Sequence, residues 1–136
     1  MLLKHEFELF RNLLSLQDAI ILHALILHRT DKVLVESNSI EFLQELDNQS
    51  SVGQCVISLG DVDEGLANAA AVKARGISLE YGVELVDAEV VSLIHRKGYG
   101  LILWVVNEPD DISAAWNSEP DFIETDNLQF RDYISR

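Results

Sequence analysis

Short, nearly continuous runs of apolar residues recur along the chain from residue 31 onwards, about 19 to 25 residues apart. Many of their members are β-branched, which favours strands. Strands that read as unbroken apolar runs, without an alternating polar side, are typical of a parallel sheet covered by helices. The five predicted strands are Val33–Glu36, Val52–Ser58, Ile77–Tyr81, Leu101–Val106 and Phe122–Thr125.

Helical patterns fill the intervals between these runs, and they are expected over residues 39–47, 63–75, 88–97 and 109–116. Acidic residues in the first turns complement the helix dipole, as do basic residues in the last turns of the second and third. Asn38 and Glu41 resemble a capping box that opens the first helix. Gly76 and Gly98 are expected to close the second and third, and Pro109 suits the first turn of the fourth.

Alternation of strand and helix at this spacing predicts right-handed βαβ units on a parallel sheet, hence the α/β class. We expect a single domain over residues 1–136, with a helical amino-terminal segment (1–30) before the βα units (31–136). Within that segment an apolar stripe predicts a helix over 3–14. The more uniformly apolar run 16–28 predicts a second helix, with a buried strand inside 19–27 as the alternative.

Five strands are too few to close a (β/α)₈ barrel, which needs eight strands and about 250 residues. A parallel sheet that stays open has two unpaired edges. Three arrangements remain possible: an ordinary open α/β sheet, a sheet completed by another chain, or an edge covered by the amino-terminal helices. Of these, we expect a homo-oligomer that associates through a sheet edge.

The charge of the chain narrows the class of partner. Ten Lys and Arg against 23 Asp and Glu give a net charge of −13, which disfavours binding to nucleic acid and to an anionic membrane. No apolar run reaches the length of a membrane span, and the amino terminus does not read as a signal peptide. The single cysteine, Cys55, excludes an intrachain disulfide and fits a small core residue in a reducing compartment, so a cytoplasmic protein is expected.

Acidic residues gather at the carboxyl ends of the predicted strands, where sites lie in parallel α/β folds. Carboxylate oxygens bind Mg²⁺ and Ca²⁺, so these residues form a candidate metal site. The alternative is that they cap the following helices or are simply solvated. The candidate ligands are Glu36, Glu80, Glu124 and Asp126, the last two expected on one side of an extended strand.

Two other residues have competing interpretations. Trp104 lies near the end of an otherwise aliphatic strand, where it can form a pocket wall that stacks on a ligand, or pack in the core. His95, in the last turn of a predicted helix, is expected to interact with the helix dipole rather than to act in catalysis.

Three segments resemble the glycerophosphodiester phosphodiesterase family. Residues Gly100–Ile112 (GLILWVVNEPDDI) are similar to a strand of that family which ends in W-T-V-N, followed by one residue, proline and acidic residues. Asp121–Asp126 (DFIETD) resembles its last strand, D-G-I-I-T-D, and Val33–Ser37 resembles a strand that ends in Ser-Phe. The resemblance covers about residues 31–136.

This resemblance implies a fold, an activity and some site residues. The family folds as a (β/α)₈ barrel and hydrolyses glycerophosphodiesters, a reaction of lipid metabolism, with a divalent metal and a pair of histidines. Trp104, Asn107 and Ser37 match positions at the substrate pocket, and Tyr81 ends a strand at the same edge. Asp126 matches the terminal aspartate of the last strand.

The catalytic motifs of the family, H-R-G, E-x-D, H-D and E-x-K, belong mostly to its first three strands, and this chain resembles only strands four to eight. Residues 28–30 read His-Arg-Thr, without the glycine, and no carboxylate follows in the run 52–58. Phe122 and Glu124 also replace a glycine and an isoleucine of the last strand.

We therefore expect a truncated relative without hydrolase activity of its own, acting as a binding or oligomerisation module for a glycerophosphodiester-like ligand. Two alternatives stay open. One is a metal-dependent phosphoric diester hydrolase, with Mg²⁺ or Ca²⁺ held by the carboxylates named above or with strands supplied by a partner chain. The other is an interaction module whose acidic surface binds a basic partner. No cofactor is certain from the sequence.

Overall fold

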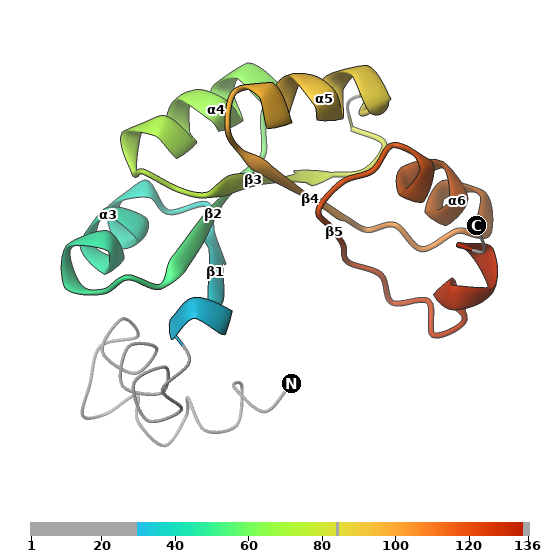
Figure 1. Cartoon of the computed structure of the whole chain (residues 1–136), viewed down its shortest axis with the longest axis horizontal. Helices are drawn as coiled ribbons and strands as arrows, with labels where there is room; N and C mark the ends of the chain where they lie inside the picture. Colours follow the sequence, from blue (N-terminus) through green and yellow to red (C-terminus); the bar gives the residue numbers. More distant parts are fainter. Residues whose placement is uncertain (1–29, 84, 135–136) are drawn as a thin grey trace.

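A computed structural model describes residues 30–83 and 85–134, so the predicted helices within residues 1–30 lie outside the described part. Within these described residues, five strands alternate with four helices (Figure 1). The strands are β1 (Leu34–Ser37), β2 (Gly53–Ser58), β3 (Gly76–Glu80), β4 (Gly100–Trp104) and β5 (Phe122–Ile123). The helices are α3 (Ile40–Gln49), α4 (Val62–Ala71), α5 (Ala88–Arg96) and α6 (Pro109–Asn117), with short 3₁₀ turns η1 (Thr30–Lys32) and η2 (Phe130–Tyr133).

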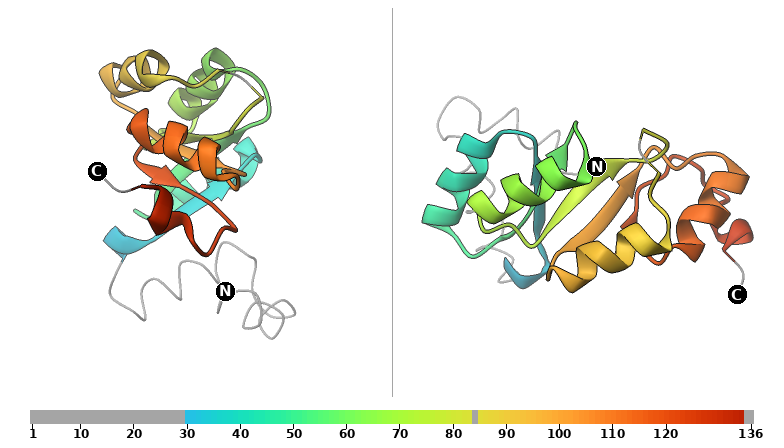
Figure 2. Two further views of the ribbon diagram at one scale, coloured as in Figure 1. Left: turned by 90° about the vertical axis from the view of Figure 1, so that its right-hand side faces the viewer. Right: turned by 90° about the horizontal axis from the view of Figure 1, so that it is seen from above.

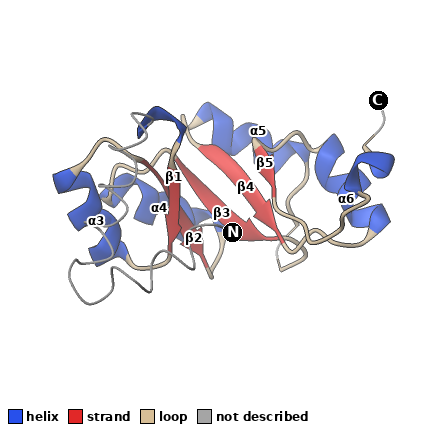
Figure 3. Ribbon diagram, turned by 90° about the horizontal axis from the view of Figure 1, so that it is seen from below, coloured by secondary structure: helices blue, strands red, loops and turns tan. Residues whose placement is uncertain are grey.

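The strands form one parallel sheet in the order β1-β2-β3-β4-β5. The sheet curls, and the helices follow its convex side (Figures 1 and 2). From the opposite side the strands lie in front of the helices (Figure 3). The predicted parallel α/β fold, with βα units like part of a barrel, is therefore confirmed as a curled half-barrel.

The hydrophobic core lies between the convex side of the sheet and the helices. Alternate residues of the central strands point into it, and several are completely inaccessible to solvent. Ile77, Leu101 and Leu103 are each 0% exposed, and they belong to one core cluster with buried residues of α3, α4, α5 and α6. Burying a side chain of this size stabilises the fold by about 1.5–3 kcal/mol, so this layer holds strands and helices together.

Two helix ends differ from the sequence prediction. The cap of α3 is Ser39 rather than Asn38, because the Ser39 hydroxyl accepts a hydrogen bond from the backbone N–H of Phe42. Helix α4 ends at Ala71, since Lys73 adopts a left-handed conformation with φ 54°. The expected ends at Gly98 (φ 86°) and Pro109 are observed.

Gly76 therefore has a different role from the predicted helix cap. It is the first residue of β3, and a side chain there would meet the backbone carbonyl oxygen of Gly100 on β4. The glycine is required because two strand backbones approach closely at this position.

The last strand is shorter than predicted. β5 contains two residues and β4 ends at Trp104, because Val105 turns the chain with φ 61°. The predicted strand through Thr125 is therefore wrong in its extent, and Glu124 and Asp126 follow β5 instead of lying within it.

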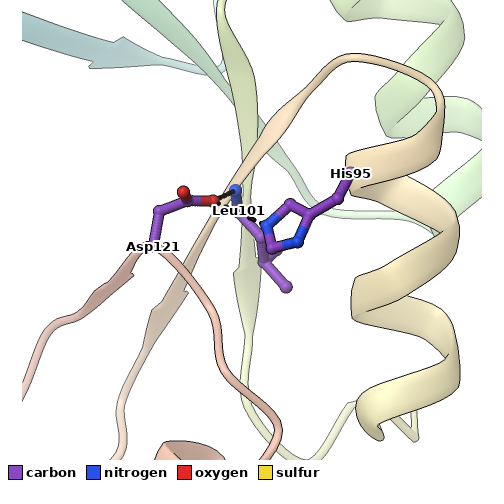
Figure 4. Close-up of polar contacts among 3 residues, drawn as sticks. All are labelled: His95, Leu101 and Asp121. Carbon is purple, nitrogen blue, oxygen red and sulfur yellow. Dashed lines mark hydrogen bonds and ion pairs between the residues drawn. The ribbon is translucent and has the colours of Figure 1, made fainter.

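The side chain of Asp121 holds β5 beside β4 (Figure 4). Its Oδ2 accepts a hydrogen bond from the backbone N–H of Leu101 at 2.7 Å and lies 3.0 Å from Nε2 of His95 in the last turn of α5. The backbone N–H of Asp121 also donates to the Leu101 carbonyl. His95 thus has a specific carboxylate partner in addition to the predicted position at a helix end.

Candidate functional site

The register of the strands assigns each side chain to one side of the sheet. Val56, Ile77 and Leu101 face the helices, and residues on either side of them along each strand point to the concave side. In-register partners share a side, so the concave set follows from the pairing. It consists of Leu34, Glu36, Cys55, Ile57, Ser78, Glu80, Ile102, Trp104 and Phe122.

Polar residues occupy the middle of this concave side, where barrel interiors usually hold Val, Ile and Leu. Glu36 on β1 is half-buried near Ser78 on β3, and it interacts electrostatically with Glu124, which follows β5. β1 and β5 are opposite edges of the sheet, so its curl brings these residues together. In barrels, alternate strands supply each interior layer, and β1, β3 and β5 do so here.

Burial and the neighbouring carboxylate both disfavour a charge on Glu36. Loss of hydration raises its pKa above the ordinary value of 4.5, the Ser78 hydroxyl opposes that rise, and Glu124 adds to it. Ser78 is 0% exposed, and its hydroxyl makes no hydrogen bond of normal geometry. This polar centre therefore has unsatisfied hydrogen-bonding capacity in a half-buried position.

Replacing Glu36 by glutamine should stabilise the protein at neutral pH. A pKa that is raised on folding contributes stability at low pH, and that contribution is lost as the pH rises through the folded-state pKa. We expect Glu36→Gln to raise the free energy of unfolding by roughly 0.2–1 kcal/mol at pH 7, the size of a single side-chain pair interaction in a sheet, because it removes a desolvated charge and its repulsion from Glu124. Below the ordinary glutamate pKa of 4.5 the gain should disappear.

Urea unfolding at several pH values measures this difference. Glu119→Gln, at an exposed position after α6, is the matched control and should change stability little at any pH. A Glu36→Gln variant that is less stable than the parent protein at pH 7 would show that the Glu36 carboxylate is stabilising.

A pocket of about 240 Å³ opens at the carboxyl ends of β4 and β5. Its lining combines an aromatic wall with polar and acidic groups. The indole Nε1 of Trp104 is buried and has no hydrogen-bond partner. Beside it, Val105 has φ 61°, a conformation that β-branched residues rarely adopt and that is found at binding and active sites. The lining residues are Trp104, Val105, Asn107, Glu124, Thr125 and Asp126.

Asn107 links the segment after β4 to the segment after β5, and both segments line this pocket. Its Oδ1 accepts hydrogen bonds from the backbone N–H of Asp126 at 2.8 Å and from the Thr125 hydroxyl at 3.3 Å. Its backbone carbonyl accepts from Nδ2 of Asn127 at 2.9 Å. These bonds occupy the amide oxygen, so Asn107 positions the segment after β5, while ligand contact by its amide nitrogen stays a prediction.

The structure separates the remaining predicted site residues from the Trp104 pocket. Ser37 is in register with Val56, on the helix side, and its hydroxyl accepts from the backbone N–H of Ser39. Tyr81 packs against the helix-side core, where burial, and to a lesser extent the Asp111 carboxylate, raises its pKa. Glu80 borders a second cleft, with residues of the loops after β2 and β3.

The four predicted carboxylate ligands are thus not gathered at one point. Over residues 30–83 and 85–134, no three His, Cys, Asp or Glu side chains lie close enough to hold a metal ion together. The Glu36 and Glu124 carboxylates with the Ser78 hydroxyl are the oxygen groups that do meet. A cation there would need water for most of its coordination shell, and the metal site stays a prediction.

Cys55 also faces the concave side, where it is buried. Burial, with smaller effects from Glu36 and Asp121, raises the pKa of its thiol to about 12. The sulfur therefore stays protonated at neutral pH, which suits the predicted packing role and not a nucleophile.

Sequence reasoning missed Ser78 and Val105. A serine within the apolar run 76–79 was a signal for the first, because a polar residue in a covered strand needs a reason. No feature of the Val-Val pair at 105–106 distinguishes the strained residue from its neighbour, which is 0% exposed.

The fold and the position of the pocket define the class: an open half of a (β/α)₈-type barrel with a candidate site at the carboxyl ends of its strands. No protein-family model and no curated protein matches the sequence. In the described part of the chain, no helix combines the length and the apolar composition that a membrane span requires.

Three solved structures that match this chain are all assigned to the same kind of enzyme. A protein from Silicibacter pomeroyi, assigned as a glycerophosphoryl diester phosphodiesterase, aligns with TM-score 0.74 and 19% identity over 87% of this chain and 43% of its own. A protein from Galdieria sulphuraria, assigned as a glycerophosphodiester phosphodiesterase, aligns with TM-score 0.75 and 18% identity, over 88% of this chain and 50% of its own. A protein from Agrobacterium tumefaciens, with the same assignment as the first, aligns with TM-score 0.67 and 16% identity, over 81% of this chain and 46% of its own.

This chain therefore spans about half the length of the structures it matches. The resemblance predicted from the Trp104 strand is confirmed at the level of the fold, as part of a barrel of this kind.

Proposed function

We propose that this chain is a half-barrel relative of the glycerophosphodiester phosphodiesterases that binds a small polar ligand beside Trp104 and does not hydrolyse it unaided. The observation that carries the proposal is the pocket of about 240 Å³ formed by Trp104, Asn107 and Asp126. These are residues matched to the family's strands. The absence of hydrolysis rests on the sequence, which lacks the H-R-G and E-x-D motifs.

The charge of the pocket limits the ligand. Its lining contains two carboxylates, Glu124 and Asp126, and no basic side chain. A bare phosphodiester anion is disfavoured beside them, whereas a glycerophosphodiester with a cationic headgroup can place that group near the carboxylates and the indole face of Trp104. We therefore propose glycerophosphocholine-like compounds as the ligand class.

The alternative function, metal-dependent phosphoric diester hydrolysis, is favoured by the meeting of Glu36, Ser78 and Glu124. Bound Mg²⁺ or Ca²⁺ would supply the positive charge that this pocket lacks and that a phosphodiester anion needs for binding. In that case the Glu36 and Glu124 carboxylates would hold the ion, and Trp104 would orient the substrate.

Fluorescence of Trp104 tests ligand binding directly. Titration of the protein with glycerophosphocholine, with and without Mg²⁺ or Ca²⁺, should change the indole emission to saturation. Trp104→Phe should abolish the change, while Trp116→Phe, in α6, should retain it. An emission change that survives Trp104→Phe, or no saturable change under any condition, would overturn the proposed site.

We also propose self-association through a sheet edge, with a role in lipid metabolism and a cytoplasmic location. Within the described residues β1 and β5 are the outer strands of the sheet, and an unpaired strand edge is a template for another chain. Light scattering across a range of protein concentrations tests this, since a monomer at every concentration would contradict it.

A further inference from the structure

Exposed apolar side chains cluster on two neighbouring loops at the carboxyl end of the sheet. Leu59, in the loop after β2, is 71% exposed, and Val83 and Leu85, in the loop after β3, are 66% and 78% exposed. Exposure of an apolar side chain to water is unfavourable. Exposed apolar residues that lie together mark interaction surfaces more often than scattered ones do. We refer to Leu59, Val83 and Leu85 as the apolar rim.

Leu59 and Val83 border one cleft, although 24 residues separate them in the sequence. The cleft is also lined by Ser58, Leu79 and Glu80, so it combines apolar side chains with one carboxylate. Parallel pairing of β2 with β3 places the two loops side by side. Leu59 and Val83 therefore share one cleft, and Leu85 follows two residues after Val83 in the same loop.

Acidic residues surround the apolar rim, and no lysine or arginine occurs within residues 58–72 or 79–95. The acidic groups lie in the adjacent loops and helix starts, namely Asp61, Asp63, Glu64, Glu80, Asp87 and Glu89. Most described basic residues lie instead near the amino ends of the strands, as Lys32, Lys73, Arg75, Arg96 and Lys97 do. The surface thus combines exposed apolar side chains with a negative electrostatic potential.

The apolar rim is separate from the surfaces used in the proposed function. β2 and β3 are inner strands of the order β1-β2-β3-β4-β5, so association through a sheet edge would not cover these loops. The residues that line the Trp104 pocket belong to β4 and the segments after β4 and β5. An occupant of the apolar rim must therefore be something else.

We propose that the apolar rim is a docking surface for a basic amphipathic segment of a partner protein. An aliphatic side chain of that segment would enter the cleft between Leu59 and Val83, and its lysines or arginines would lie against the surrounding carboxylates. Charge complementarity selects this occupant, because the same carboxylates repel an anionic membrane or a nucleic acid.

The test uses a defined probe, a fluorescently labelled amphipathic peptide of about 14 leucines and lysines, long enough for roughly four helical turns. Fluorescence anisotropy with the full chain should show saturable binding. The affinity should fall by about tenfold or more between low salt and 0.5 M salt, because the Debye length shrinks to a few ångströms.

Variants distinguish the apolar rim from general attraction to an acidic protein. Leu59→Ser with Val83→Ser should weaken binding by about tenfold, equivalent to about 1.4 kcal/mol. Leu128→Ser, at a position that is 99% exposed after β5, should leave it unchanged. Glu80→Lys should weaken binding more than Glu119→Lys, which makes the same charge change away from the cleft.

Equal binding by the double variant and the parent protein would overturn the proposal, as would binding to neutral phosphatidylcholine vesicles in place of the peptide. The rim variants should keep the Trp104 fluorescence response to glycerophosphocholine. Loss of peptide binding alone therefore reports on the apolar rim, and loss of the fluorescence response reports on the proposed pocket.

Discussion

Leu103→Ala should lower the free energy of unfolding by about 2–5 kcal/mol, a large part of the roughly 5–15 kcal/mol of a typical domain. Leu103 lies in β4, is 0% exposed and packs between the sheet and the helices. Truncation removes its buried methyl groups and leaves a cavity that the surrounding strands cannot fill. Urea unfolding followed by circular dichroism measures the loss.

The matched comparison is Phe122→Ala on the opposite side of the sheet. Phe122 is in register with Ile102 on the concave side and is 58% exposed. In an open half-barrel its truncation should cost less than about 1 kcal/mol, because little buried area is lost. A cost equal to that of Leu103→Ala would mean that something covers the concave side beside Phe122.

Asp121→Ala should destabilise the protein by about 1–3 kcal/mol. The variant leaves the Leu101 backbone N–H without its 2.7 Å acceptor and removes the His95 contact. Because β5 contains two residues, Asp121 is a substantial part of what fixes this strand and the pocket segment after it. The same unfolding experiment at pH 7 gives the value.

Two further variants separate the contributions. Asp121→Asn keeps an oxygen that can accept from Leu101 and should recover much of the lost stability. His95→Ala removes a half-exposed contact and should cost less than about 1 kcal/mol. If His95→Ala were as damaging as Asp121→Ala, the hydrogen bond to Leu101 would not be the main contribution.

Local signals in the sequence determine most of the fold. Apolar runs of strand length are read correctly because helices cover one side of the sheet and the curl leaves the other side partly buried. Asp87 accepts from the backbone N–H groups of Glu89 and Val90, and Gly98 is left-handed, so the boundaries of α5 follow from short-range chemistry. Gly76 was misread because close approach of β3 and β4 is a tertiary constraint that no local pattern reports.

The candidate site was less accessible to such reasoning. Trp104 was found because an indole in an aliphatic strand is unusual. Asp126 was found as a carboxylate at a strand end and was matched again by the family resemblance, from which Asn107 came. The meeting of Glu36 with Glu124 depends on the curl of the whole sheet, because the two residues belong to opposite ends of the strand order. The four-carboxylate site assumed that all strand ends converge, whereas Glu80 borders a different cleft from Asp126.

The most direct test of the account is a hydrolysis assay on the purified full chain, with glycerophosphocholine and bis(p-nitrophenyl) phosphate as substrates and Mg²⁺, Mn²⁺ or Ca²⁺ supplied in turn. We expect no metal-dependent turnover above that of the Glu36→Gln, Glu124→Gln double variant, although glycerophosphocholine should still perturb Trp104. Metal-dependent turnover that the double variant loses would contradict the account.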